Sequence, residues 1–336
     1  QGKRSQFTGV LAQEAQRLGV DFRYGADVTG YSDSEHRPAV MLGGGELVRG
    51  DVIVVCDGAK STARAAMASK DSVTTPRQNS GFAIHRSIIC SKPIRDDPRC
   101  SHLLDGSIRF FLGDNAHAEI WPLDHGSQLA FTFTHPDHEG TSTLNKRMTT
   151  SISTCLALMK DWDPVLRAAV ENFPSTHYWT ILEDTVEAGW VSKGGKIVFA
   201  GDAVHPLSPA SFQGATQACE DGATIAECLA LSGATPERVP IALKAYERLR
   251  CDRAAKAGQL GRKQQQIMHS FVRRSAAEGT FHPSPDRLLN FEMYDFDAVE
   301  HCLQNWERIV NELEIEESLK PKSTDGPTSR YFAETV

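Results

Sequence analysis

The sequence predicts an α/β protein in which a layered domain with a parallel sheet carries an inserted domain with an antiparallel sheet. Two short apolar runs rich in β-branched residues, at 51–56 and 196–200, are each followed by one Gly and one Asp. Such runs suit strands that are buried on both faces of a parallel sheet. Between them, from about 80 to 135, apolar and polar residues alternate without the helices that a parallel sheet requires.

The remaining elements follow from apolar spacing and turn residues. A helix is expected over 7–18, a strand over 19–24, and a hairpin over 40–48 around three consecutive glycines. The inserted region predicts strands at 108–112, 117–121 and 128–133. Helical spacing returns over 142–170 and again beyond Pro240. We expect the tail from Glu316, rich in Lys, Ser, Thr and Pro, to be mobile.

These elements divide the chain into five parts. The expected boundaries are 1–78 for the first part of the layered domain, 79–190 for the inserted domain, 191–262 for the return to the layered domain, 263–315 for a C-terminal helical segment, and 316–336 for a flexible tail.

Charge and composition exclude several classes of function. The formal net charge is −7 and the isoelectric point is near 6.0, so there is no basic surface large enough for a nucleic acid. The longest strongly apolar runs are far too short to span a membrane. His135 and His138 are paired without a third ligand in view, which favours a surface loop over a metal site.

The eight cysteines indicate the compartment. They are scattered without a Cys-x-x-Cys pair, and a chain of 336 residues does not need disulfide bonds to hold its core. They are therefore expected to be reduced thiols in a cytoplasmic protein.

The segment 195–230 carries the most specific pattern. A buried strand ends in Gly201-Asp202, a Pro-rich loop follows, and a helix begins at Gly214. The first turn of a helix offers unpaired N–H groups and partial positive charge, which suit a phosphate or an electron-rich ring edge. Asp202 is placed to accept hydrogen bonds from ligand hydroxyls. One side of the helix, a narrow face of mostly small residues, is expected to pack on the sheet: Ala215, Ala218, Cys219, Gly222, Ile225, Ala226 and Leu229.

This pattern, Gly-Asp-Ala-x-His-Pro-x-x-Pro followed by Gln213-Gly214 and Glu220-Asp221, resembles the GD fingerprint of class A flavoprotein monooxygenases, the salicylate hydroxylase-like group. An ordinary strand–helix unit with a loop-capping Asp202 is the bland alternative, and the length of the match argues against it. The resemblance implies that Asp202, Gly214 and Ala215 bind FAD.

Two further stretches support the resemblance. Residues 50–64 resemble the DG fingerprint of the family, with Asp57-Gly58, Ser61 and Arg64 after a buried strand. By resemblance, Asp57 and Arg64 serve FAD and the nicotinamide cofactor. The segment 243–256 resembles the Tyr-Glu-x-x-Arg-x-x-Arg segment of the family and supports the fold more than the chemistry.

Two arginines complete the candidate site. Arg4 stands where the family has an Arg that contacts FAD, and its alternative is a solvated terminal side chain. Arg86 lies in a strand that resembles the one on which the family carries an Arg into the substrate domain. There it could anchor an acidic or phenolate substrate, although a surface arginine fits its position equally well.

The resemblance implies a fold and a reaction. The fold is a glutathione-reductase-type FAD-binding domain with an inserted antiparallel substrate domain and C-terminal helices. The reaction uses NAD(P)H and O₂ to hydroxylate or epoxidise an aromatic or conjugated small molecule, with a lean towards secondary metabolism. The protein supplies positioning and a dry site. A simple flavin reductase or oxidase needs the same cofactor and stays open.

The sequence also departs from the family. The opening strand, Gly-x-Gly-x-x-Gly turn and helix have no counterpart in residues 1–336, so we expect a chain cut at its N-terminus. This motivates an alternative from another class, a non-catalytic remnant or partner-dependent subunit that does not bind FAD alone, with a homodimer or an N-terminal partner chain as its assembly. Phe212 stands where Gly or Ala is usual, and Thr216 where Asn is usual.

Overall fold

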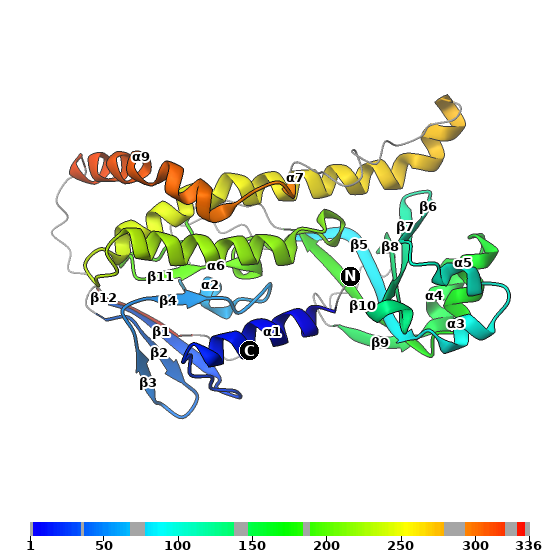
Figure 1. Ribbon diagram of the computed structural model, residues 1–336, viewed down its shortest axis with the longest axis horizontal. Helices are drawn as coiled ribbons and strands as arrows, with labels where there is room; N and C mark the ends of the chain where they lie inside the picture. The colour runs from blue at the N-terminus through cyan, green and yellow to red at the C-terminus, as the bar shows by residue number, and fades with distance from the viewer. Residues whose placement is uncertain are drawn as a thin grey trace. The chain divides into compact units, whose positions relative to one another are not determined.

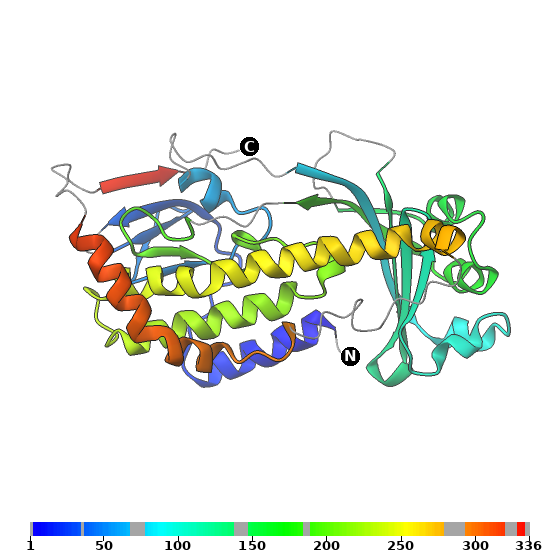
Figure 2. The same cartoon turned by 90° about the horizontal axis from the view of Figure 1, so that it is seen from above.

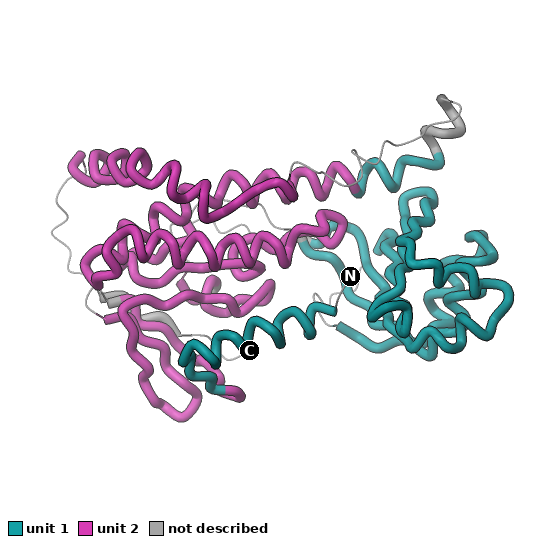
Figure 3. Tube along the Cα trace, in the orientation of Figure 1, with its two compact units in different colours: residues 1–23, 78–182, 265–284 teal, residues 24–77, 183–264, 285–336 magenta. Residues whose placement is uncertain are grey.

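The computed structural model describes residues 3–34, 37–67, 78–137, 147–183, 189–278, 293–319 and 328–332. The chain forms two compact units, and each is assembled from three separate segments (Figures 1 and 3). Unit 1 comprises residues 1–23, 78–182 and 265–284, and unit 2 comprises residues 24–77, 183–264 and 285–336. The long helix α7 (Val239–Glu278), which Figure 2 shows from the side, contributes residues to both units.

Unit 2 contains two sheets. The first is antiparallel, with strand order β12-β1-β2-β3, and joins β12 (Thr328–Phe332), β1 (Val28–Ser34), β2 (Ala39–Leu42) and β3 (Leu47–Arg49). The second is a parallel pair formed by β4 (Ile53–Val55) and β11 (Ile197–Phe199). The two strands of this pair come from the two ends of the stretch that contains the inserted domain, so the chain returns to unit 2 after that domain, as the sequence predicts.

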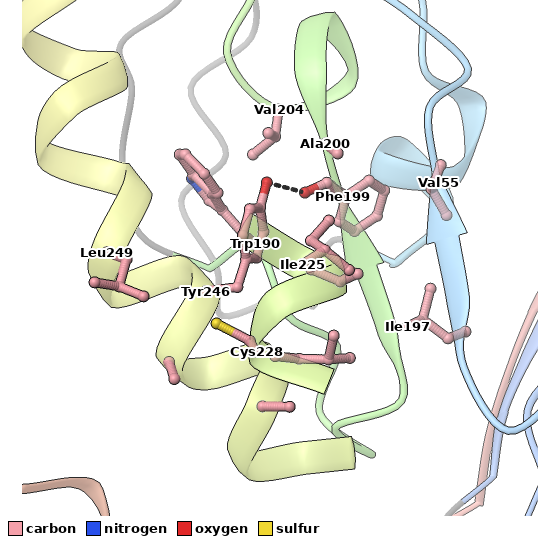
Figure 4. Close-up of a cluster of buried hydrophobic side chains, with 14 of the residues drawn as sticks. Val55, Trp190, Ile197, Phe199, Ala200, Val204, Ile225, Cys228, Tyr246 and Leu249 are labelled. Atoms are coloured by element: carbon pink, nitrogen blue, oxygen red, sulfur yellow. Dashed lines mark hydrogen bonds between the residues drawn. The ribbon is translucent and has the colours of Figure 1, made fainter. Parts of the chain in front are cut away.

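Three helices and α7 accompany these sheets: α2 (Thr62–Met67), α6 (Gly214–Leu231) and α9 (Ala298–Ser318). The core of unit 2 lies between β11, α6 and α7 (Figure 4). Its largest side chains are Trp190 and Tyr246, whose ring centroids are 5.6 Å apart. The Tyr246 hydroxyl donates to the Phe199 carbonyl at 3.1 Å, which ties α7 to β11 and satisfies a buried polar group.

Unit 1 is built on a six-stranded antiparallel sheet with strand order β6-β7-β8-β5-β10-β9. The strands are β5 (Gln78–Cys90), β6 (Arg109–Gly113), β7 (Ala116–Leu123), β8 (Gln128–Pro136), β9 (Met148–Ser151) and β10 (Ser175–Glu183). The helices are α1 (Arg4–Arg17), α3 (Lys92–Asp96), α4 (Ile152–Leu158) and α5 (Pro164–Glu171). Short 3₁₀ turns cover Ser101–Leu104 and Asp124–Gly126 in unit 1, and Gly201–Ala203 and Pro209–Ser211 in unit 2.

The apolar core of unit 1 uses one face of this sheet. Phe131 and Phe133 of β8 and Ala118 and Ile120 of β7 are buried there with residues of α4 and α5. Side chains alternate between faces along a strand, so the intervening residues of β5, β7 and β8 point to the other face. That second face carries the polar residues described below.

Several expectations are wrong in detail. Residues 19–24 form no strand: Gly19 has a φ of +89°, and Val20 and Tyr24 are exposed. Within the region expected to be helical, 148–151 is strand β9. Val54, expected to be buried, is 40% exposed. The tail also differs, because α9 continues to Ser318 and strand β12 pairs antiparallel with β1.

Helix α6 buries only part of the predicted face. Ile225 is buried and Leu229 packs against the core, as predicted. The rest of that face is exposed, namely Ala215, Ala218, Cys219, Gly222 and Ala226, and the other buried residues of the helix are Gln217, Glu220, Asp221, Thr224 and Cys228. Burial of carboxylates is tolerated when each is paired and hydrogen-bonded, and the partners that make it possible lie on α7. Small size alone therefore did not identify the packed face.

Candidate functional site

The two fingerprint loops lie at one edge of the parallel pair. Phe199 of β11 stands beside Val55 of β4, and the Ala200 amide donates to the Val55 carbonyl at 3.0 Å. Because the strands are parallel, their carboxyl ends meet at the same edge. Asp57 and Asp202, far apart in the chain, therefore follow neighbouring strands.

The loop after β11 needs glycine at its first position. Gly201 has a φ of +59°, and a Cβ built there would lie 3.2 Å from the Cβ of Ala218. A side chain would meet both backbone strain and a tight contact. The Gly201 amide donates to Asp221 at 2.8 Å, so the loop is fastened to α6.

Asp221 is the centre of a buried polar network. Besides the Gly201 amide, its carboxylate receives His205 Nε2 at 2.6 Å and Arg250 Nε at 2.9 Å. Burial by itself would raise the pKa of Asp221, but the hydrogen bond and charge of His205, the charge of Arg250 and the Gly201 amide together lower it. The carboxylate stays charged and holds the loop in one conformation.

A second carboxylate extends the network. Glu220 receives Arg250 Nη1 and Arg253 Nε at 2.5 and 2.6 Å. On α7, which carries both arginines, Glu247 accepts the backbone amides of Gly189 and Trp190. Within the Tyr-Glu-x-x-Arg-x-x-Arg segment, Arg250 thus supports the loop after β11 through Asp221, and Glu247 holds the chain that precedes β11. These are structural roles, as predicted for this segment.

The N-terminus of α6 is open to a ligand. Its N-cap residue, Gln213, makes no side-chain capping hydrogen bond, and Ala215 and Thr216 are exposed. Gln213, immediately before Gly214, is 2% exposed, and its Nε2 has no hydrogen-bond partner among the described residues. A buried donor without an acceptor is costly, and an acceptor on a bound ligand would satisfy it.

Phe212 enters this turn in a strained conformation. Its φ is +54°, a left-handed geometry that most L-residues avoid. The side chain is 42% exposed. Glycine would adopt this backbone geometry without strain.

The loop after β4 has a matching construction. Gly58 adopts a φ of +82°, and the Ser61 hydroxyl accepts the Arg64 amide at 3.0 Å, as expected for a capping residue. Asp57 is exposed and accepts the Ala63 amide at 3.4 Å. The Arg64 guanidinium donates to the Val204 carbonyl at 3.3 Å. Arg64 therefore connects the two fingerprint loops.

The two predicted arginines belong to unit 1. Arg4 is the first residue of α1 and is exposed, while Arg86 on β5 is half-buried. Burial lowers the pKa of Arg86, as do the charges of Arg4 and Arg147, and the Glu119 carboxyl opposes them. The structure thus places five predicted cofactor residues in unit 2 and Arg4 and Arg86 together in unit 1.

Arg86 lies in a polar row that sequence reasoning missed. It stands opposite Thr132 of β8, which stands opposite Glu119 of β7, so the three share one face of the sheet. Glu119 is 6% exposed and receives the Thr132 hydroxyl at 2.8 Å. The signal in the sequence was a glutamate and a histidine at alternate positions of a mostly apolar strand.

Two buried histidines adjoin this row. His117 Nε2 lies 3.7 Å from Glu119 Oε1, and His117 Nδ1 lies 2.8 Å from His269 Nε2. Burial, followed by the charge of His269, lowers the pKa of His117 to about 3, and burial lowers that of His269 to about 4. Both rings are therefore neutral near neutral pH.

The described residues contain neither a membrane-spanning helix nor a metal-binding cluster. None of their helices has the length and apolar character needed to cross a membrane. No group of three or more His, Cys, Asp or Glu side chains among them is arranged to hold a metal ion. His135, expected on a surface loop, is instead 5% exposed at the end of β8, and His138 lies outside the described residues.

The chain is similar to known flavoproteins over most of its length. Residues 3–260 match the FAD binding domain family. The FAD-dependent monooxygenase fmqB of Aspergillus fumigatus is 30% identical over 255 residues, which is 72% of this chain and 59% of the relative. Asperlicin C monooxygenase of Petromyces alliaceus is 30% identical over 263 residues, or 75% of this chain and 55% of the relative. The chain thus spans little more than half the length of these relatives.

Solved structures are also similar to this chain. FqzB superposes with a TM-score of 0.76 at 26% identity, covering 96% of this chain and 74% of that one. Salicylate hydroxylase in a substrate complex has a TM-score of 0.68 at 19% identity, covering 94% and 75%, and shares the fold.

These matches confirm the predicted fold class and FAD as the cofactor of the family. The match to the FAD binding domain extends over more than half of the chain, and the relatives bear the names of FAD-dependent monooxygenases. The chain therefore belongs to the FAD binding domain family.

Proposed function

We propose that this chain acts in an FAD-dependent monooxygenase that uses NAD(P)H and O₂ to hydroxylate or epoxidise an aromatic or conjugated small molecule of secondary metabolism. The observation that carries the proposal is the meeting of the two fingerprint loops at one edge of the β4–β11 pair, beside the open N-terminus of α6. The names of relatives such as asperlicin C monooxygenase support the metabolic setting.

The residues at this edge fit FAD. Asp202 is half-buried after a strand, where its carboxylate can accept hydroxyl groups of the ribityl chain. The amides of Gly214 and Ala215 and the unpartnered Nε2 of Gln213 offer donors to the oxygen-bearing edge of the isoalloxazine ring. When bound, FAD accepts two electrons from NAD(P)H and supplies the oxygen-transfer chemistry.

The other predicted residues have supporting roles. Arg64 holds the loop after β11 through the Val204 carbonyl, and with Asp57 it serves FAD and the nicotinamide cofactor. Arg4 assists FAD binding. Arg86 faces the substrate and balances negative charge on it. We place the protein in the cytoplasm, which its eight free cysteines support.

The first test is flavin binding by the purified 336-residue chain. FAD is added, the excess is removed, and the visible spectrum is recorded. We expect oxidised-flavin bands at one FAD per chain. A folded chain that retains no flavin would overturn the proposal and favour a flavin-free or partner-dependent subunit, an alternative to which the comparisons give no support.

A variant pair tests the assigned site. Asp202→Ala should weaken FAD binding about 10–100-fold, the loss expected for one or two hydrogen bonds to a charged group. Asp161→Ala, at an exposed turn residue of unit 1, is the matched control and should bind FAD like the parent chain. Equal affinities for the two variants would remove Asp202 from the site.

Coupling separates a monooxygenase from a flavin reductase or oxidase. NAD(P)H consumption is followed together with oxygenated product for a panel of aromatic compounds. With its best substrate, a monooxygenase transfers one oxygen atom of labelled O₂ into the product for each NAD(P)H consumed. Consumption that yields only hydrogen peroxide with every compound would favour an oxidase.

A further inference from the structure

The second face of the unit 1 sheet carries one continuous polar row. Glu119, Thr132 and Arg86 stand directly opposite one another on β7, β8 and β5. The apolar core occupies the other face, so no residue of that core covers this row. A carboxyl and a guanidinium therefore lie two strands apart, with a hydroxyl between them.

Glu119 is buried without a full ionic partner. Its Oε2 accepts the Thr132 hydroxyl, and its Oε1 lies 3.7 Å from His117 Nε2. Arg86 acts on it through space from β5, two strands away. Burial raises the pKa of Glu119 to about 7, against the opposing effects of Thr132 and Arg86. Around Arg86, Arg4 and Arg147 add positive charge.

The histidine pair offers a path for one proton. A single hydrogen joins His117 Nδ1 and His269 Nε2, because both rings are neutral. If His117 donates in that bond, its Nε2 is an acceptor and suits a protonated Glu119. If His269 donates, His117 Nε2 carries the hydrogen and suits an ionised Glu119. The tautomer of His117 and the charge of Glu119 are therefore linked.

We infer that Glu119 is a positioning residue for Arg86: it exchanges a proton in step with the His117–His269 pair and thereby sets the net charge with which the row receives a substrate. This rests on the proposed function, in which Arg86 faces the substrate. With Glu119 neutral, the guanidinium is uncompensated and the row favours an anionic aromatic group such as a phenolate or carboxylate. With Glu119 ionised, that preference falls.

The proton is conserved in this scheme. An aromatic O–H or N–H acid that binds as its anion gives up one proton, and Glu119 takes up one proton as the anion pairs with Arg86. No electron moves and no bond other than that to hydrogen changes. The row thus favours substrates with an acidic O–H or N–H group on a conjugated ring.

The test follows the carboxyl and the ring directly, in the full chain. Side-chain ¹³C signals of labelled Glu and ¹⁵N signals of labelled His are recorded from pH 5 to 9. We expect one Glu carboxyl to titrate near neutral pH and the His117 tautomer to switch over the same range. Glu119→Gln should abolish both changes. A His117 tautomer that stays constant while Glu119 titrates would overturn the inference.

Two variants of β8 provide matched controls. Thr132→Val removes the hydroxyl that stabilises the carboxylate, so the carboxyl titration should move to higher pH. Thr134→Val changes the next residue on the same face, which stands opposite His117 rather than Glu119, and should leave the midpoint within a few tenths of a unit. Equal midpoints for the two variants would show that Thr132 does not act on Glu119. Circular dichroism confirms that each variant is folded.

A binding experiment extends the test to Arg86. Benzoate and its neutral amide, benzamide, serve as probes in calorimetry at pH 7.5 in two buffers of different ionisation enthalpy. Benzoate should bind more tightly than benzamide and take up protons in the parent chain but not in Glu119→Gln. Benzoate binding without proton uptake, or no preference for benzoate, would overturn the assignment. Loss of NAD(P)H turnover with an intact titration would instead contradict only the proposed function.

Discussion

At the scale of single residues, Phe212 occupies a backbone conformation that favours glycine over any other residue. Its left-handed φ of +54° costs an ordinary L-residue about 1–2 kcal/mol, and glycine avoids this cost. We expect Phe212→Gly to be more stable than Phe212→Ala by about 1 kcal/mol in urea unfolding, since both lose the ring. The same pair at Val272, an exposed position in α7, should give the opposite order because alanine favours helix. Equal stability of the two Phe212 variants would refute the strain argument.

Glu119 gives the fold an unusual dependence on pH. A carboxyl whose pKa rises from 4.5 to about 7 on folding adds stability that is complete below pH 4.5 and lost as the pH rises through 7. The full loss corresponds to about 3 kcal/mol. Glu119→Gln should therefore lose less stability than the parent chain between pH 5 and pH 8.

The buried histidines change the stability of the parent chain and of Glu119→Gln equally. Their effect has the opposite pH dependence to that of Glu119. Their pKa values fall on folding, so their contribution is lost as the pH falls below 6.5. The difference between the two proteins isolates Glu119, and urea unfolding at several pH values measures it. Parallel stability curves for the two proteins would contradict the assigned pKa.

At the scale of elements, the contact of α6 with α7 depends on charge rather than on apolar packing alone. Arg250 is 1% exposed and pairs with Glu220 and Asp221. Arg250→Met would remove a buried cationic partner from both carboxylates and should cost about 3–5 kcal/mol of unfolding free energy. Arg248→Met on the same helix breaks an exposed pair with Glu316 and should cost less than about 1 kcal/mol. Similar losses in both variants would show that the buried network is not coupled.

The elements also show how far the sequence could lead. The β4 and β11 strands and the turns that follow them were predictable because each has a local cause: a run of β-branched residues before the turn and a left-handed glycine within it, Gly58 or Gly201. The packed face of α6 was not predictable, since burying Glu220 and Asp221 depends on arginines from a helix later in the chain. Strand β12 was not predicted for a similar reason, because its partner β1 lies near the other end of the sequence.

The same reasoning applies to the candidate sites. Residues 57, 64, 202, 214 and 215 could be named because their motifs are contiguous, whereas the Arg86 row is assembled across three strands and only sheet register reveals it. The roles of these residues, and the domain boundaries at 78, 190, 262 and 315, stay predictions.

At the scale of the whole molecule, the pairing of β4 with β11 has a consequence for folding kinetics. The two strands flank the entire inserted sheet in sequence, so their pairing closes a long loop, while the pairs β5–β8, β7–β8 and β6–β7 join nearer segments. Loop-closure entropy delays contacts of high contact order. Pulsed hydrogen exchange during refolding should therefore protect amides of β7 and β8 before those of β4 and β11. Simultaneous protection would rule this order out. On the ribosome, the edge that holds both fingerprint loops can form only after residue 199 has emerged, so a nascent chain would present its inserted sheet before it could capture a flavin.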